Sequence, residues 1–244
     1  MNLLLLHPDQ LTAPDRALVR DRQLRHLTEV HRAQVGDQLM VGQVNGAIGS
    51  GRVESLNPVA AELSVEWHEQ PPPPLPLTLV LALPRPKMLR RIIQSSVAMG
   101  VKKLVLINSY RVEKSYWQTP WLGEESLAEQ ITLGLEQARD TRWPQILQRP
   151  LFKPFVEDEL SALAGSSRRL IAHPASDLPC PMAVTDPVTL CIGPEGGFIP
   201  YEVELMQKQG FEAVQIGPRI LRTETAIPAL LGRLFDPFHL PLGR

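Results

Sequence analysis

The sequence predicts an α/β fold in two parts, a small amino-terminal β-barrel or sandwich and a larger domain built on a parallel sheet. Short β-like runs occupy the first 70 residues, a proline-rich stretch follows at 71–76, and continuous apolar runs then alternate with helical segments. Because proline fits neither a helix interior nor a central strand, the stretch is expected to be a linker. The predicted domains are therefore residues 1–70 and 77–244.

The amino-terminal domain is predicted from four short apolar runs separated by turn signals. Asn45-Gly46 and Asn57-Pro58 are typical of turns between strands. Gly49-Ser50-Gly51 lacks the third glycine and the following helix of a dinucleotide-binding fingerprint, so it predicts a hairpin or bulge. A helical segment at 21–33 interrupts the strands. The runs are NLLLL, DQLMVGQV, AIGSGRVESL and AAELSVEW.

The larger domain is predicted from apolar strands that alternate with helices. Continuous apolar strands indicate a parallel sheet covered on both faces, and ligands of such sheets bind beyond the carboxyl ends of the strands. The loops at 193–197 and 216–226 are expected at that edge. The predicted strands are 77–83, 102–108, 168–173, 188–193 and 212–217, and the predicted helices are 87–100, 125–139, 200–210 and 226–235.

Composition excludes several classes of protein. The 244 residues contain no run of 18 or more apolar residues, so no membrane span is expected. The apolar start NLLLL is broken by His7 and Pro8, with no basic flank or cleavage site behind it, so no signal peptide is expected and the predicted location is the cytoplasm. Cys180 and Cys191 are expected to be a free pair rather than a disulfide, and their spacing predicts no metal site.

Positive charge is concentrated in one segment of a chain whose net charge is only −1. Residues 84–114 contain Arg85, Lys87, Arg90, Arg91, Lys102, Lys103, Arg111 and Lys114 against Glu113 alone. Such an asymmetry is typical of a surface that binds a polyanion, and a solvated helix face is the alternative interpretation.

The loop at 193–197, Gly-Pro-Glu-Gly-Gly, presents backbone rather than side chains. Its three glycines permit positive φ and let a ligand approach the main chain closely. Pro200 then suits the first turn of a helix, and Gly210 is expected to end that helix. No lysine or hydroxyl follows the glycines and Glu195 would repel an anion, so a phosphate cradle is excluded. The loop predicts a neutral or cationic ligand held by backbone hydrogen bonds.

The second loop, 216–226, reads IGPRILRTETA. Thr225 is predicted as the N-cap of the last helix, because that start places Pro228 in the first turn, where its missing N–H costs little. Residues 217–224 are then irregular backbone. A plain strand-to-helix connection with an Arg222–Glu224 surface ion pair is the alternative, but apolar Ile220 and Leu221 in a loop suggest packing against a flat group.

LCIGPEGGFIPYEVELM followed by IGPRILRTETA resembles the signature of the RsmE family of SPOUT methyltransferases, which methylate N3 of a uridine in small-subunit ribosomal RNA. HLTEVHR at 26–32, RPKMLRRIIQSSVAMGV, EQARDTRWPQI and AHP at 172–174 extend the resemblance over most of the chain. This chain departs from the pattern of the family at His31, Met99 and Asp140.

The resemblance implies a PUA-like β-barrel joined to a domain whose carboxyl-terminal segment forms a trefoil knot. It also implies a homodimer with the active site at the subunit interface, and S-adenosylmethionine held by three loops. The implied cofactor-binding residues are His173, Pro174, Ile192, Gly193, Pro194, Gly196, Gly197, Ile216, Gly217, Ile220, Leu221, Thr223 and Ala226.

The uracil N3–H is mostly protonated at neutral pH. If its pKa is two units above ambient, forming the anion costs about 2.7 kcal/mol, which one positioned group can offset. Arg222 is the candidate for stabilising the developing charge, and Glu195 or Glu224 either accepts the proton or orients its loop. Small-subunit ribosomal RNA or the 30S particle is the expected partner. The candidate RNA-binding residues are Arg25, His26, Arg32, Arg85, Lys87, Arg90 and Arg91.

Two other functions stay open from the sequence. One is a methyltransferase of the same superfamily acting on another RNA, such as transfer RNA. The other is an RNA-binding module without catalysis, because barrels of the implied type bind RNA alone.

Overall fold

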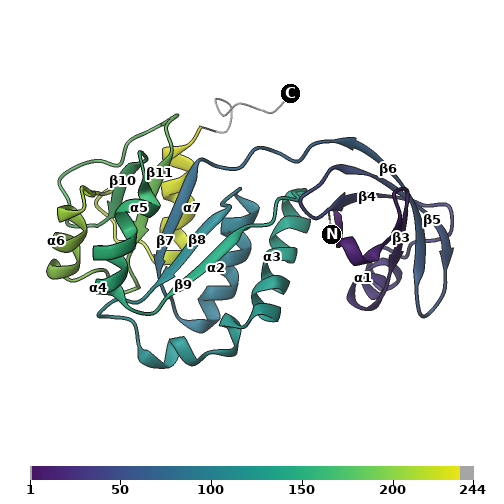
Figure 1. Cartoon of the computed structure of the whole chain (residues 1–244), viewed down its shortest axis with the longest axis horizontal. Coiled ribbons are helices and arrows are strands. Elements are labelled where there is room, and N and C mark those ends of the chain that lie inside the picture. Colours follow the sequence, from purple (N-terminus) through teal and green to yellow (C-terminus); the bar gives the residue numbers. More distant parts are fainter. Residues whose placement is uncertain (1, 237–244) are drawn as a thin grey trace. The chain divides into compact units, whose positions relative to one another are not determined.

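The computed structural model describes residues 2–236, and its described part forms two compact units (Figure 1). Among the described residues, the first unit runs to Pro72 and includes Thr132–Trp143, while Pro73–Ile131 and residues 144–236 form the second. The chain first crosses from the first unit to the second between Pro72 and Pro73, inside the predicted linker. Residues 237–244, the end of the predicted second domain, lie outside the described part.

The first unit is built on a six-stranded mixed sheet with the order β1-β4-β5-β6-β3-β2. Only β1 and β4 pair in parallel; the other neighbours are antiparallel. The strands wrap one apolar core, to which β6 contributes its alternate residues Ala61, Leu63 and Val65. The sheet therefore fits a barrel-like domain. Its strands are β1 (Leu4–Leu6), β2 (Leu11–Ala13), β3 (Arg16–Val19), β4 (Gln38–Gln43), β5 (Ile48–Leu56) and β6 (Ala61–Glu69).

The predicted bulge at Gly49 is confirmed. The pairing of β5 with β6 shifts register between Ile48 and Gly49. A Cβ atom on Gly49 would overlap the carbonyl oxygen of Glu66, so only glycine lets the two strands approach this closely. The predicted turn at Asn45-Gly46 is also present, with Asn45 at a φ of 57°.

The predicted helix at 21–33 is shorter than expected. Helix α1 (Asp21–Arg25) continues only as a π-helical turn, η2 (His26–Val30). Arg22 of α1 forms an ion pair with the buried carboxylate of Glu136, with 3.0 Å between Nη2 and Oε1. Asp140, where the chain departs from the family, is buried and accepts a hydrogen bond from the backbone N–H of Arg142. The unit also contains η1 (Pro8–Gln10).

The second unit confirms the predicted parallel sheet. All six strands are parallel, in the order β12-β10-β11-β7-β8-β9. β11 is buried at all five positions, as expected for a strand covered on both faces. β9 was not predicted, because as an edge strand it lacks a continuous apolar run. The strands are β7 (Leu77–Ala82), β8 (Lys103–Ile107), β9 (Gln145–Arg149), β10 (Arg168–Ala172), β11 (Val188–Ile192) and β12 (Glu212–Val214).

Helices cover both faces of this sheet. Parallel crossovers are right-handed, so the connection from β7 to β8 and the connection from β11 to β12, which run in opposite directions across the sheet, lie on opposite faces. Consistent with this, α2 packs against α7 and α6 packs against η5 (Figure 1). The helices are α2 (Pro86–Ala98), η3 (Lys114–Gln118), η4 (Pro120–Leu122), α3 (Glu124–Ala138), α4 (Phe152–Pro154), η5 (Phe155–Glu159), α5 (Leu160–Ala164), α6 (Pro200–Lys208) and α7 (Thr223–Leu234).

Several local predictions in this unit are confirmed. Pro200 is the first residue of α6, and Gly210, at a φ of 81°, follows its end. Cys180 and Cys191 are both free and buried, and burial raises the pKa of both thiols. Within residues 2–236 no helix is both long enough and apolar enough to cross a membrane.

Candidate active site at the carboxyl edge of the parallel sheet

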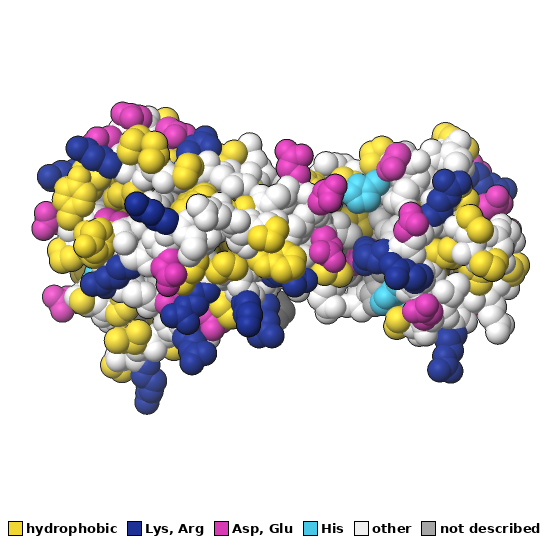
Figure 2. Space-filling view, turned by 90° about the horizontal axis from the view of Figure 1, so that it is seen from below, with side chains coloured by type: hydrophobic (Ala, Val, Ile, Leu, Met, Phe, Trp, Pro, Cys, Tyr) yellow, Lys and Arg dark blue, Asp and Glu magenta, His cyan; other side chains and the backbone are white. Residues whose placement is uncertain are grey.

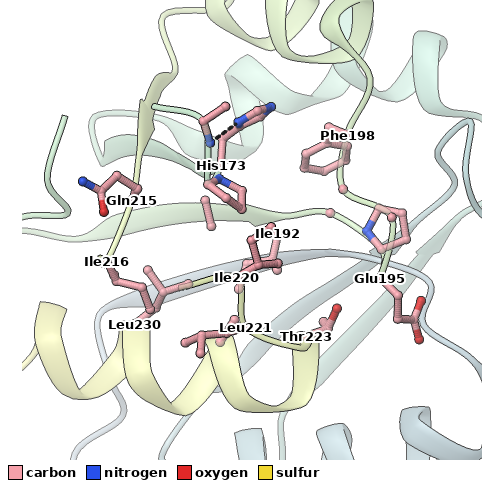
Figure 3. A pocket seen from close by; sticks show the side chains of 18 of the residues that line it. His173, Ile192, Glu195, Phe198, Gln215, Ile216, Ile220, Leu221, Thr223 and Leu230 are labelled. Atoms are coloured by element: carbon pink, nitrogen blue, oxygen red, sulfur yellow. Dashed lines mark hydrogen bonds between the residues drawn. The ribbon is translucent and has the colours of Figure 1, made fainter. Parts of the chain in front are cut away.

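A cavity of about 350 Å³ lies where three neighbouring strands of the parallel sheet end. The last residues of β10, β11 and β12, which are Ala172, Ile192 and Val214, all line it. The loops that follow these strands form its walls, together with the first part of α7 (Figure 3). The cavity therefore lies at the edge of the sheet where the sequence places a ligand.

The structure brings all of the cofactor candidates around this cavity, although they come from three separate loops. They are His173, Pro174, Ile192, Gly193, Pro194, Gly196, Gly197, Ile216, Gly217, Ile220, Leu221, Thr223 and Ala226. Glu195 also lines the cavity. Arg222 and Glu224, the other two catalytic candidates, do not. Arg222 is exposed and is not a lining residue, although Leu221 and Thr223 on either side of it are.

The glycine-rich loop uses its three glycines in different ways. Of the three, only Gly197 uses the positive φ that a glycine permits, with a φ of 73°. Gly193 is required by the loop's own backbone, because a Cβ there would lie 2.8 Å from the nitrogen of Phe198. A Cβ on Gly196 would lie 2.8 Å from Cδ of Arg111, a side chain that can move. Close contacts between main-chain atoms, as at Gly193, therefore shape this loop more than left-handed backbone, which occurs only at Gly197.

Glu195 has a hydrogen-bond partner on another loop. Its Oε1 accepts a hydrogen bond from the backbone N–H of Arg85 at 3.2 Å. Arg85 is the N-cap of α2. In Figure 3 the Glu195 side chain points away from Ile192 and Leu221 toward the rim of the site. The carboxylate thus ties the glycine-rich loop to the start of α2.

A second carboxylate, that of Glu202, joins the glycine-rich loop to the loop that follows β8. Glu202 is only 2% exposed. Its Oε1 accepts from the backbone N–H of Tyr110 at 2.7 Å, and its Oε2 accepts from the backbone N–H of Ile199 at 3.0 Å. The next residue, Arg111, donates from Nη1 to the carbonyl oxygen of Gly196 and lines the cavity. These contacts fix the glycine-rich wall of the cavity to the loop that follows β8.

The last helix begins earlier than predicted. α7 starts at Thr223 with Arg222 as its N-cap, so the prediction of Thr225 as N-cap was wrong and Pro228 lies inside the helix. The carbonyl of Arg222 accepts from the N–H groups of Thr225 and Ala226, at 2.9 and 2.8 Å. One face of α7 is buried from its first turn, and this burial outweighs the hydrogen bond that proline removes. The buried residues are Thr223, Ile227, Leu230, Leu231 and Leu234.

His173 is held by its own loop. Its Nδ1 accepts a hydrogen bond from the backbone N–H of Ala175 at 3.1 Å, drawn as a dashed line in Figure 3. In the neutral ring the proton is then on Nε2. His173 is one of the residues that line the cavity.

The RNA-binding candidates of the second unit lie at the start of α2. Arg85, Lys87 and Arg91 are exposed. Arg90 is half-buried, with its guanidinium carbon 4.3 Å from the centre of the Trp121 ring, an arrangement typical of a cation–π contact. Figure 2 shows Lys and Arg side chains on one face of this unit, with Asp and Glu between them.

The candidates of the first unit differ in their surroundings. Arg25 is exposed at the end of α1. His26 packs edge-on against His31, with 4.9 Å between ring centres, and burial together with the charge of His31 lowers its pKa. Arg32 follows the π-helical turn at a φ of 52°, so its expected position on the helix was wrong.

Sequence reasoning missed several residues that line the cavity. Ala172 and Val214 are the last residues of strands, which is the one signal that would have selected them. Arg111 and Leu230 reach the cavity from a distant loop and from the buried face of α7, and no local motif marks them. The missed residues are Arg111, Ala172, Ala175, Phe198, Val214, Gln215, Arg219 and Leu230.

Comparisons with known proteins agree with this architecture. The chain resembles ribosomal RNA small subunit methyltransferase E of Treponema pallidum, 29% identical over 234 residues that cover 93% of this chain and 87% of the relative. Ribosomal RNA small subunit methyltransferase E of Neisseria gonorrhoeae, in a crystal structure bound to S-adenosyl methionine, has a TM-score of 0.75 at 23% identity over 95% of each chain. A probable rRNA-methyltransferase from Porphyromonas gingivalis has a TM-score of 0.70 at 25% identity, also over 95% of each chain.

One family covers more than half of the sequence. The family model of the RNA methyltransferase domain matches residues 71–234. This range includes every loop that lines the cavity. The chain therefore belongs to the RNA methyltransferase domain family.

Proposed function

We propose that the protein transfers a methyl group from S-adenosylmethionine to N3 of a uridine in small-subunit ribosomal RNA, in the cytoplasm. The observation that carries this proposal is the cavity in which three loops of an RNA methyltransferase domain meet. The named relatives supply the class of RNA, and the structural neighbour bound to S-adenosyl methionine supports the methyl donor.

The cavity lining fits this donor chemically. Most of its side chains are apolar, and its charged residues are Arg111, Glu195 and Arg219. A volume of about 350 Å³ lies in the range of small-molecule sites. Ile192, Leu221 and Leu230 offer flat apolar contacts, and the Gly193–Gly197 loop offers backbone groups. When bound, S-adenosylmethionine supplies an electrophilic methyl group on a sulfonium, which carries no phosphate.

We assign different roles to the three catalytic candidates. Arg222 is exposed next to two cavity-lining residues, so its guanidinium is available to a uracil presented from outside and would stabilise the negative charge on the base oxygens. The hydrogen bond to Arg85 supports the role of Glu195 in orienting its loop. Glu224, half-buried in the first turn of α7, is then the candidate proton acceptor.

RNA recruitment is assigned to basic side chains of both units. Arg85, Lys87 and Arg91 are exposed at α2, and Arg25 and Arg32 are exposed on the first unit, as phosphate contacts require. We therefore propose that the first unit is a PUA-like RNA-binding domain. A target base within a helix would have to leave its stack to reach the cavity.

The homodimer and the trefoil knot are further parts of the proposal. Ile220 supports the dimer, because it is 83% exposed on the loop that lines the cavity, and exposed apolar groups beside a site favour a partner surface. Support for the knot comes from α7, which follows the edge strand β12 and yet packs against α2. Sedimentation velocity tests the dimer, for which we expect twice the 27.2 kDa of the chain.

The function is tested by mass spectrometry of nucleosides from small-subunit RNA of strains with and without the gene. We expect 3-methyluridine to disappear from that RNA when the gene is deleted and to return with the wild-type gene. Its persistence, together with loss of a methylated nucleoside from another RNA, would indicate the other-target function. Calorimetry with S-adenosylmethionine separates the remaining alternative, because a non-catalytic RNA-binding module would not bind it.

A further inference from the structure

Tyr110 exposes most of its ring directly beside the cavity. The residue is 79% exposed, compared with 51% for Tyr201 on α6. It follows β8 within a few residues, and the next residue, Arg111, lines the cavity. A large aromatic ring left in water next to a binding site is a candidate contact for a ligand rather than a part of the core.

The backbone under this ring is held on both sides. The N–H of Tyr110 donates to the buried carboxylate of Glu202 at 2.7 Å. Before it, Ser109 is only 3% exposed; after it, Arg111 is bonded to the carbonyl of Gly196. The ring therefore projects from a fixed main chain, and a ligand that packs on it orders only two side-chain torsions. This geometry lowers the entropy cost of binding.

The surroundings of the ring favour a nucleic acid. Arg111 and Lys114 are exposed in the same loop. Arg85 also lies near this loop, because its charge lowers the pKa of Tyr116. Burial and the hydrogen bond to Glu113 raise the pKa of Tyr116. The Glu113 carboxylate therefore already accepts a hydrogen bond from the Tyr116 hydroxyl. An aromatic face among arginine and lysine side chains is the arrangement that binds unstacked bases between phosphates.

We infer that Tyr110 is the stacking surface for an unpaired base of the RNA substrate at the mouth of the cavity. This inference rests on the proposed function, because it assigns a substrate contact to the same site. The ring face would hold the target base, or its neighbour in the strand, outside the stack while Arg85 and Lys114 contact the phosphates. Stacking is insensitive to base identity, so Tyr110 contributes affinity and position, and the choice of uridine is made elsewhere.

The test compares Tyr110→Ala, Tyr110→Trp and Tyr201→Ala in the full-length protein. The probe is small-subunit RNA purified from a strain that lacks the gene. We expect Tyr110→Ala to raise both the KM for RNA and the Kd from filter binding about ten-fold, as loss of one stacked base does. Tyr110→Trp should restore both values. The Kd for S-adenosylmethionine, measured by calorimetry, should not change in any variant.

Four outcomes would overturn the inference. They are an unchanged RNA affinity in Tyr110→Ala, an equal loss in Tyr201→Ala, a parallel loss of S-adenosylmethionine affinity, or a shift to monomers in sedimentation velocity, which would make Tyr110 a contact between two copies of the chain. If the wild-type protein methylated no small-subunit RNA, the proposed function would fail, whereas the filter-binding comparison would still decide the role of Tyr110.

Discussion

The carboxylate of Glu195 accepts a hydrogen bond from the backbone N–H of Arg85, at 3.2 Å, across two loops that are 110 residues apart in the sequence. One loop lines the cavity and the other begins α2, which carries exposed basic side chains. The wall of the candidate cofactor site is therefore tied directly to a candidate RNA-binding helix. Five predictions test this arrangement and the residues around it.

Glu195 is expected to act as an anchor rather than as the proton acceptor. Glu195→Gln keeps an oxygen that can accept from Arg85, so methyl transfer should stay within about two-fold of wild type. Glu195→Ala removes the bond, which contributes about 1 kcal/mol, and should weaken S-adenosylmethionine binding about five-fold. Steady-state kinetics and calorimetry measure both. Equal loss of kcat in the two variants would instead assign the proton to Glu195.

Arg222 is expected to act on the reaction and not on cofactor binding. Its side chain lies outside the cavity lining, so Arg222→Ala should leave the Kd for S-adenosylmethionine unchanged. Loss of a group that stabilises developing negative charge lowers kcat by roughly 100-fold or more, and Arg222→Lys should recover part of it. Single-turnover methylation of small-subunit RNA provides the measurement. Normal turnover by the alanine variant would remove Arg222 from the mechanism.

Glu202 is expected to matter for stability and cofactor affinity together. Glu202→Ala leaves the N–H groups of Tyr110 and Ile199 without their acceptor, and each lost hydrogen bond costs about 1 kcal/mol. Chemical denaturation should show this loss of unfolding free energy, and S-adenosylmethionine should bind more weakly. Glu204→Ala is the matched control, because that neighbour on α6 is exposed and should change stability by less than about 0.5 kcal/mol. Similar losses in the two variants would refute the role of Glu202 in holding the two loops.

The glycines of the 193–197 loop are expected to differ in tolerance. Gly193→Ala places a methyl group 2.8 Å from a backbone nitrogen, which cannot move without opening the loop, and should abolish cofactor binding. Gly196→Ala meets only the side chain of Arg111, which can shift, so affinity should fall several-fold at most. Calorimetry on both folded variants makes the comparison. The reverse order of losses would contradict the geometry.

The exposed basic side chains of α2 are expected to contact phosphates. The triple variant of Arg85, Lys87 and Arg91 to Ala should bind RNA more weakly at low salt. The slope of log affinity against log salt should also fall by about one unit for each phosphate that is no longer neutralised. Filter binding over a salt series measures it. The control is Lys208→Ala, in the last turn of α6, for which we expect the wild-type slope; an unchanged slope in the triple variant would move the RNA surface elsewhere.

The elements predicted from the sequence are those with a strong local pattern. β7, β8 and β11 are largely runs of buried apolar residues, β10 has a buried apolar centre at Leu170 and Ile171, and the bulge at Gly49 and the first turn of α6 depend on single residues with special backbone preferences. β2, β3 and β9 were missed because edge strands and short hairpins expose part of their surface and so lack a continuous apolar run. The start of α7 was misplaced because burial of Thr223 and Ile227 outweighs the local cost of Pro228.

The sequence by itself determined the parallel sheet, the edge of that sheet at which the cavity lies, and the two loops that carry most of the cavity lining. Those features follow from hydrophobic periodicity and from glycine and proline, which act over a few residues. Only the tertiary structure decided that Glu195 bonds to Arg85, that Glu202 holds Tyr110, and that Arg111 reaches Gly196. The partners in these contacts are 85 to 110 residues apart, and folding brings them together through the sheet rather than through any local preference of the chain.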